Sequence, residues 1–192
     1  MERTTPETSA AAEGVQQQRP TVAAEKKIKV LVPIDESDGS FYALRWALDH
    51  LFHNYSTGLD PVEQEQNTVT LVNVQQPFQP FIYPAGPVVY ATTAMIDAVK
   101  KAQEENAANI LSHALHMCKE KKVKAETLIL EGDPKDKICQ AAEQLHVDLL
   151  VLGSRGLGAI RRALLGSVSN YCAHHAHCPV LIVKPPPKLP HE

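Results

Sequence analysis

The sequence lacks the features that would place the protein in a membrane, among secreted disulfide-rich domains or among polyanion-binding proteins. No run of about 18 apolar residues occurs and the mean hydropathy is -0.20, so we expect no membrane-spanning helix. Four cysteines in 192 residues are too few for a disulfide scaffold, which fits a reducing compartment. With 19 basic against 22 acidic residues, the net charge of -3 argues against a dominant nucleic-acid-binding face.

Common catalytic and phosphate-binding motifs are also absent. No glycine precedes a lysine, which excludes a Walker A loop, and Arg161 stands where a dinucleotide fingerprint starting at Gly156 would need its third glycine. Neither the Gly-x-Ser-x-Gly nucleophile elbow nor the His-Glu-x-x-His zinc motif occurs. The sequence therefore disfavours P-loop enzymes, dinucleotide oxidoreductases, α/β-hydrolases and zinc proteases of that type.

Both ends of the chain have the composition of non-globular segments. Residues 1–27 are rich in Ala, Gln, Thr and Glu, have no apolar signal-peptide core, and carry the acidic residues that transit peptides avoid. We predict a disordered leader at 1–27, one folded domain at 28–185 and a short tail at 186–192. A cytoplasmic location is expected, and entry into the nucleus stays open.

Short apolar runs alternate with amphipathic stretches along residues 28–185. Nearly continuous apolar runs are typical of strands buried on both faces, and stripes spaced by three and four residues predict helices. The predicted strands are 28–34, 68–74, 125–130, 148–153 and 180–183, and the predicted helices begin after Ser40, near Thr93, at Pro134 and near Ser167. The alternation predicts an α/β fold, with a five-stranded parallel sheet covered by helices on both faces.

A proline-rich segment interrupts this pattern between the second strand and the second helix. Residues 75–92 hold four prolines and one glycine, which no regular helix or central strand tolerates. A long irregular segment in a compact domain is commonly either functional or disordered. Its role stays open.

Polar residues and glycines follow the predicted strands, where an open parallel sheet binds its ligands. The most informative are Gly153-Ser154-Arg155-Gly156 and, nine residues later, Gly166-Ser167-Val168-Ser169. Backbone N–H groups at glycines can approach a ribose or phosphate closely, and free N–H groups at a helix N-terminus favour an anion. The alternative is that the glycines only turn the chain and Ser167 only caps a helix, and the glycines alone support both interpretations equally.

The combined pattern resembles the universal stress protein family. It consists of Gly-x2-Gly-x9-Gly-Ser between the strands DLLVLGSRG and CPVLIVK, the opening VLVPIDES, and Gly132-Asp133-Pro134 before the third helix. The resemblance runs from Ile28 to Lys184 and is strongest to plant single-domain members. It implies a Rossmann-like or flavodoxin-like sheet, shared with adenine nucleotide alpha hydrolase-like proteins, and homodimerisation. Because the glycine pattern is complete, it also implies binding of ATP or AMP, with Mg²⁺ as a companion of ATP.

The resemblance also implies ten site residues, which are Pro33, Asp35, Val74, Gly153, Arg155, Gly156, Gly166, Ser167, Val168 and Ser169. The first two would lie near the adenosine, and the third would flank the base. The next three would line the ribose and the phosphate turn, and the last four would hold the phosphates. Asp35 would either bond a ribose hydroxyl or help to hold a divalent ion, and the sequence does not choose.

Other reactive side chains have simpler explanations. The run from Cys172 to Cys178 contains three histidines, but a structural zinc site usually joins two ligand pairs, so we expect no metal there. Cys118 and Cys139 fall on inner helical stripes and are expected to be small buried hydrophobes, and the absence of Cys-x-x-Cys leaves a redox role unsupported. Asp133 is best explained as a helix cap.

Three functional hypotheses follow. The first is an adenine-nucleotide-binding protein of the stress response that acts as a nucleotide-dependent switch and dimerises through its apolar last strand. The second is a chaperone-like or interaction protein with a vestigial nucleotide site. The third is a weak ATPase, slow because no general base with a positioned partner is evident and no catalytic residue is assigned.

Overall fold

The computed structural model describes residues 28–52, 68–77, 92–156 and 165–186. The predicted leader, the tail from 187, residues 78–91 of the proline-rich segment, and Arg161 lie outside them. The elements in chain order are β1 (Lys29–Pro33), α1 (Asp38–His50), β2 (Thr68–Gln75), α2 (Thr93–Glu120), β3 (Lys124–Glu131), α3 (Pro134–Gln144), β4 (Leu149–Gly153), α4 (Ser167–His175) and β5 (Val180–Val183). The predicted alternation of strands and helices is confirmed.

All five strands pair in parallel, in the order β3-β2-β1-β4-β5. β1 lies at the centre, where Val32 pairs with Leu71 of β2 and Leu31 pairs with Leu150 of β4. The chain moves outward from β1 in one direction through β2 and β3, and in the other through β4 and β5. The carboxyl ends of β1 and β4 therefore form the point of reversal at which such sheets bind ligands.

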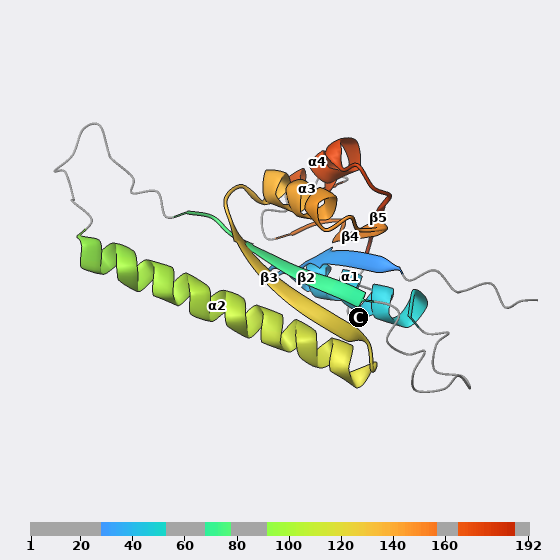
Figure 1. Cartoon of the computed structure of the whole chain (residues 1–192), viewed down its shortest axis with the longest axis horizontal. Coiled ribbons are helices and arrows are strands. Elements are labelled where there is room, and N and C mark those ends of the chain that lie inside the picture. The colour runs from blue at the N-terminus through green and yellow to red at the C-terminus, as the bar shows by residue number, and fades with distance from the viewer. Residues whose placement is uncertain (1–27, 53–67, 78–91, 157–164, 187–192) are drawn as a thin grey trace, which may run out of the picture.

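Helices cover both faces of the sheet, α1 and α2 on one and α3 and α4 on the other (Figure 1). Because side chains alternate along a strand, Val30 and Val32 of β1 enter the α1/α2 core and Leu31 enters the α3/α4 core. All three are fully buried. This two-sided burial explains the nearly continuous apolar runs in the sequence.

α2 is buried over only part of its length. Its fully buried residues are Ala107, Leu111, Ala114 and Cys118, all in the second half of the helix. Ile96 and Val99, which continue the same apolar stripe into the first half, are only half-buried. The first half of α2 extends past the sheet in Figure 1, so the amphipathic pattern alone overestimates the packed length. No helix of the described ranges is long and apolar enough to cross a membrane.

Candidate functional site

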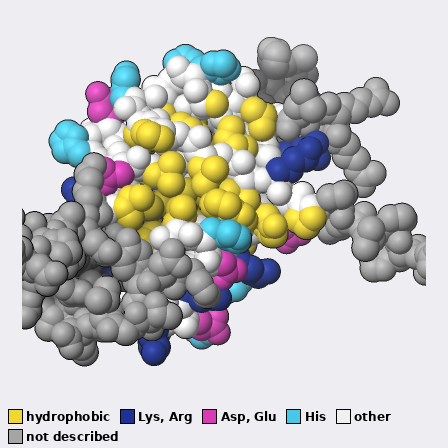
Figure 2. All heavy atoms as spheres, turned by 90° about the vertical axis from the view of Figure 1, so that its right-hand side faces the viewer, with side chains coloured by type: hydrophobic (Ala, Val, Ile, Leu, Met, Phe, Trp, Pro, Cys, Tyr) yellow, Lys and Arg dark blue, Asp and Glu magenta, His cyan; other side chains and the backbone are white. Residues whose placement is uncertain are grey.

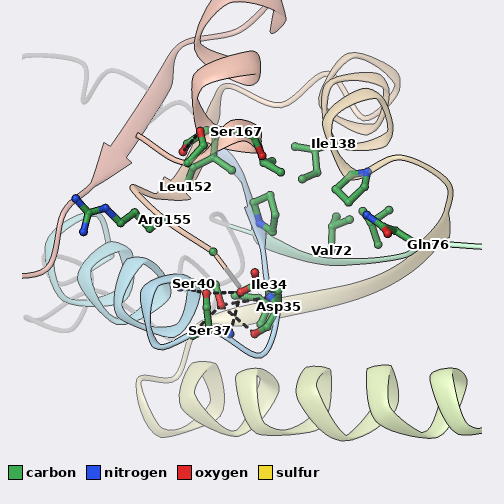
Figure 3. Close-up of a pocket in the computed structure, with 18 residues that line it drawn as sticks. Ile34, Asp35, Ser37, Ser40, Val72, Gln76, Ile138, Leu152, Arg155 and Ser167 are labelled. Atoms are coloured by element: carbon green, nitrogen blue, oxygen red, sulfur yellow. Dashed lines mark hydrogen bonds between the residues drawn. The ribbon is translucent and has the colours of Figure 1, made fainter. Parts of the chain in front are cut away.

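A cavity of about 510 Å³ opens at the carboxyl ends of β1, β2 and β4 and the N-terminal ends of α3 and α4 (Figure 3). We call it the strand-end cavity. It is lined by Pro33, Ile34, Asp35, Ser37, Ser40, Val72, Val74, Gln76, Pro134, Ile138, Leu152, Gly153, Arg155, Gly156, Gly166, Ser167, Val168 and Ser169. Its volume lies in the range typical of small-molecule and cofactor sites.

All ten candidate residues from the sequence line this one cavity. They come from the end of β1, the end of β2, the segment after β4 and the first turn of α4, which are up to 136 positions apart, from Pro33 to Ser169. The structure thus brings the predicted set together. That these residues bind a nucleotide stays a prediction.

The loop between β1 and α1 holds the Asp35 carboxylate in place. Its Oδ1 accepts hydrogen bonds from the Ser37 N–H, at 3.0 Å, and from the Ser37 hydroxyl. The Ser37 hydroxyl oxygen also caps α1 by accepting from the Ser40 N–H at 3.3 Å. The Ser40 hydroxyl lies 3.0 Å from the carbonyl oxygens of Asp35 and Ser37 and accepts from the Asp35 N–H at 3.2 Å. These hydrogen bonds therefore hold the Asp35 carboxylate in position before any ligand binds.

The same loop packs backbone to backbone against the segment that follows β4. A Cβ added at Gly39 would overlap the carbonyl oxygen of Arg155, and one added at Gly153 would lie 2.7 Å from the carbonyl oxygen of Gly39. A Cβ at Gly156 would lie 2.7 Å from Asp35 Oδ2. Each contact is closer than a side chain allows, so glycine at these positions lets the two walls of the cavity meet.

The N-terminus of α4 closes the cavity on the other side. Gly166 is its N-cap, and within the described ranges no side chain caps this helix. The Gly166 N–H donates to the carbonyl oxygen of Ser154 at 2.8 Å, and the Ser169 hydroxyl lies 3.2 Å from the same oxygen. These bonds fix α4 to the segment after β4. The first N–H groups of a helix have no partner within the helix and can attract an anion, and here they belong to Ser167 and Val168.

Comparison with known proteins identifies the family. A model described as the universal stress protein family matches residues 28–184. The chain belongs to the universal stress protein family. It is 32% identical over 174 residues to universal stress protein PHOS34 of Arabidopsis thaliana, covering 87% of this chain and 65% of that protein. It is also 32% identical over 156 residues to universal stress protein YxiE of Bacillus subtilis, covering 81% and 98%.

The similarity covers only part of the length of the Arabidopsis relatives. A universal stress protein A-like protein of Arabidopsis thaliana is 36% identical over 96 residues, which cover 50% of this chain and 55% of that protein. The matched part therefore spans between about half and two thirds of the two Arabidopsis relatives.

Solved structures of relatives share the fold. A universal stress protein family protein from Arabidopsis thaliana, with AMP bound, has a TM-score of 0.57 and 26% identity, covering 83% of this chain and 92% of its own. Universal stress protein UspA from Lactobacillus plantarum has a TM-score of 0.61 and 23% identity, covering 82% and 98%. The second likeness supports the fold alone.

The sequence analysis missed the apolar wall of the cavity. Val72, Leu152 and Ile138 form much of it, with Pro134 at the start of α3. The signal was present, because Val72 shares a strand face with the predicted Val74, and Leu152 directly precedes Gly153. Pro134 and Asp133 were predicted only as a helix start, and Asp133 does cap α3 by accepting from the Lys135 N–H at 2.9 Å.

Few of the described residues that line the cavity have charged side chains. Asp35 and Arg155 are the only charged residues among the described ones that line it. In Figure 3 the Arg155 side chain extends away from the other labelled residues, so Arg155 contributes mainly its backbone to the wall. Among the described residues of the lining, the other groups able to donate hydrogen bonds are mainly backbone N–H groups and serine hydroxyls.

No cysteine and none of the described histidines is among the residues that line the cavity. No group of three or more His, Cys, Asp or Glu side chains within the described ranges is arranged to hold a metal ion. His175 stacks on Tyr171 with ring centroids 4.0 Å apart. Cys118 is buried as expected, and burial raises the pKa of its thiol to about 11. Cys139 is only half-buried, and its sulfur lies 3.6 Å from that of Cys172.

Proposed function

We propose that this universal stress protein domain binds an adenine nucleotide in the strand-end cavity. The observation that carries the proposal is the convergence of four separate backbone segments on one cavity, with the N-terminus of α4 unoccupied by a side-chain cap among the described residues. The AMP bound to the Arabidopsis relative, which shares the fold over 83% of this chain, supports the class of ligand.

The lining matches the three parts of a nucleotide. The apolar wall, with Val74 and Ile138, suits the flat base. Asp35 can accept hydrogen bonds from ribose hydroxyls, since its Oδ1 is held by Ser37 and its Oδ2 faces Gly156. The phosphate belongs at the first turn of α4, where N–H groups and the positive end of the helix dipole favour negative charge.

The two serines of this turn differ in what they can do. Ser167 is exposed at the start of α4, so its hydroxyl is available to donate to a phosphate. The Ser169 hydroxyl is buried and contacts the carbonyl oxygens of Ser154 and Gly166 at 3.2 and 3.1 Å. We therefore assign phosphate binding to Ser167, and to Ser169 the positioning of the helix.

The scarcity of cationic side chains among the described lining residues bears on the choice of nucleotide. A monophosphate can be held by N–H groups and hydroxyls, whereas a triphosphate brings more negative charge than the described part of the lining neutralises. ATP would then bind together with Mg²⁺, and Asp35, whose Oδ2 faces Gly156, is the carboxylate of the described lining that could help to hold it. AMP would need no metal.

The proposal extends to a nucleotide-dependent switch in a homodimer. β5 is an edge strand of apolar residues, half-buried except for the buried Val183, and it pairs with β4 alone among the described strands. Figure 2 shows hydrophobic side chains gathered on the side where β4 and β5 lie in Figure 1. Such an edge favours pairing with a second copy. The Ser154 N–H donates to the Val183 carbonyl oxygen at 2.8 Å, which connects the cavity wall to this edge.

Calorimetry with AMP, and with ATP in the presence and absence of Mg²⁺, tests the proposal. Gly166→Val should weaken AMP binding at least about tenfold, because its Cβ would already lie 3.3 Å from Arg155 Cα and its methyl groups would crowd the anion site. Asn170→Ala, an exposed change in the same helix, is the matched control and should bind AMP like the unmodified protein. Unchanged affinity in Gly166→Val refutes the binding pose. Absence of any adenine-nucleotide binding favours the vestigial-site hypothesis.

A further inference from the structure

Two thiols meet between the helices that cover one face of the sheet. The sulfur atoms of Cys139, on α3, and Cys172, on α4, lie 3.6 Å apart. Cys172 is fully buried, whereas Cys139 is half-buried and reachable from solvent. A disulfide bond is about 2.05 Å long, so the two sulfurs need to approach by roughly 1.5 Å to form one.

We propose that Cys139 and Cys172 are a peroxide-sensitive thiol pair that closes into a disulfide between α3 and α4. This assigns a modification site to two residues that nucleotide binding does not use. A third cysteine, Cys178, lies in the same apolar cluster, but among the described residues the one sulfur–sulfur hydrogen bond joins Cys139 and Cys172.

The chemistry requires only hydrogen peroxide as oxidant. The Cys139 sulfur attacks one peroxide oxygen and breaks the O–O bond, which gives a sulfenic acid and one water. The Cys172 sulfur then attacks the sulfenic sulfur, loses its proton, and releases the hydroxyl group as a second water. Two thiols are thereby oxidised by two electrons, and one peroxide is reduced to two waters. A dithiol reductant reverses the bond by thiol–disulfide exchange.

The surroundings of the two sulfur atoms determine how fast hydrogen peroxide oxidises them. Burial raises the pKa of both thiols, so little thiolate is present near neutral pH and the first step is slow compared with that of an exposed, acidic thiol. Cys139 is the site of first attack because it is the more exposed of the pair. The pair would therefore be oxidised during sustained exposure to peroxide and stay reduced during brief exposure to low concentrations.

Closure of the pair would act on the strand-end cavity. Ile138, next to Cys139, lines the cavity, and so does Val168, one helical turn before Cys172 on the same face of α4. Drawing α3 and α4 together moves this wall, so we expect the disulfide form to bind AMP at least about threefold more weakly. This consequence rests on the proposed nucleotide binding, whereas the disulfide itself does not.

Thiol counting on the full chain tests the disulfide. The reduced protein should show four free thiols in denaturant, two after hydrogen peroxide, and four again after dithiothreitol. Cys178→Ser is the matched control and should still form the bridge, whereas Cys139→Ser should not. Peptide mass mapping should locate the bridge at Cys139 and Cys172. Four thiols after peroxide, a bridge that includes Cys178, or a bridge between two chains overturns the proposal.

Calorimetry then separates the two inferences. AMP affinity is compared between reduced and oxidised protein, with peroxide-treated Cys139→Ser as control. Equal affinity of the reduced and oxidised forms overturns the coupling to the cavity and leaves the thiol pair standing. If the reduced protein binds no adenine nucleotide, the proposed function fails, and the thiol count still decides on the disulfide.

Discussion

Asp35→Asn gives the most direct test of how the strand-end cavity would hold a nucleotide. The substitution keeps the size of the side chain but removes its charge and replaces one acceptor oxygen by a donor. Ser37 can still donate to the remaining oxygen, so the loop should keep its shape. If Asp35 bonds the ribose, the loss is that of a hydrogen bond to a charged group, about 1.5–3 kcal/mol, which corresponds to roughly 10- to 100-fold weaker binding.

Asp38→Asn is the matched control for this prediction. Asp38 lies three residues away in the first turn of α1, is exposed, and does not line the cavity. Both substitutions remove one negative charge, so a long-range effect on the phosphate would be of the same sign in each. AMP affinity should fall in Asp35→Asn and stay within about twofold of the unmodified protein in Asp38→Asn.

Adenosine serves as the second ligand in the same calorimetric assay. Because the contact is to the ribose, Asp35→Asn should weaken adenosine and AMP by similar factors. If Asp35 instead acts through a metal ion at the phosphates, adenosine binding should be unaffected. The reasoning is refuted if Asp35→Asn binds AMP as tightly as the unmodified protein while thermal melting shows both to be folded.

Three further outcomes are expected. Gly153→Ala should lower both the melting temperature and AMP affinity, because its Cβ would lie 2.7 Å from the Gly39 carbonyl oxygen; retention of both would contradict the backbone packing. Ile182→Lys on β5 should leave monomers in light scattering, and persistent dimers would place the interface elsewhere. Lys121 lowers the pKa of Asp49 through a 2.6 Å ion pair, so the pair stabilises the fold above the unfolded-state pKa and loses its effect as the pH falls through the lower folded-state value. In chemical denaturation, Asp49→Asn should therefore cost about 0.2–1 kcal/mol at pH 7, as for other exposed pairs, and progressively less as the pH falls below the unfolded-state pKa; a cost that does not decrease with falling pH would contradict this.

The sequence specified most of the fold because strand and helix signals are local. The last strand has the predicted bounds 180–183, and the second extends only one residue beyond its predicted end. The inner face of α2 was overestimated, since periodicity shows which side of a helix is apolar but not how far the sheet beneath it extends. Ile96 is half-buried for that reason, whereas Leu111 is buried.

The residues of the candidate site that belong to a sequence motif were predictable. Those that depend on contacts between distant segments were not. The glycines around Arg155 and Ser167 were identified from their spacing, and the structure places them on one cavity. Gly39 was not singled out, because its closeness to the Arg155 carbonyl oxygen joins segments more than a hundred residues apart. The contact between Cys139 and Cys172 was not predicted for the same reason, because each helical stripe shows only that its own cysteine faces the core.

The part of the cavity proposed to hold the phosphate depends on backbone groups, and this has consequences for how it can work. Backbone N–H groups at the start of α4 keep their hydrogen-bonding character whichever side chains stand there, so the fold itself would supply the proposed anion site. What must be kept is the approach of the segments, through Gly39 and Gly153, and the bond from Ser154 to the edge strand β5. A ligand that draws these segments together would therefore also shift β5, the edge strand along which a second copy would pair. Nucleotide binding and assembly would then be linked through a few backbone contacts, with no need for a hydrolytic step to connect them.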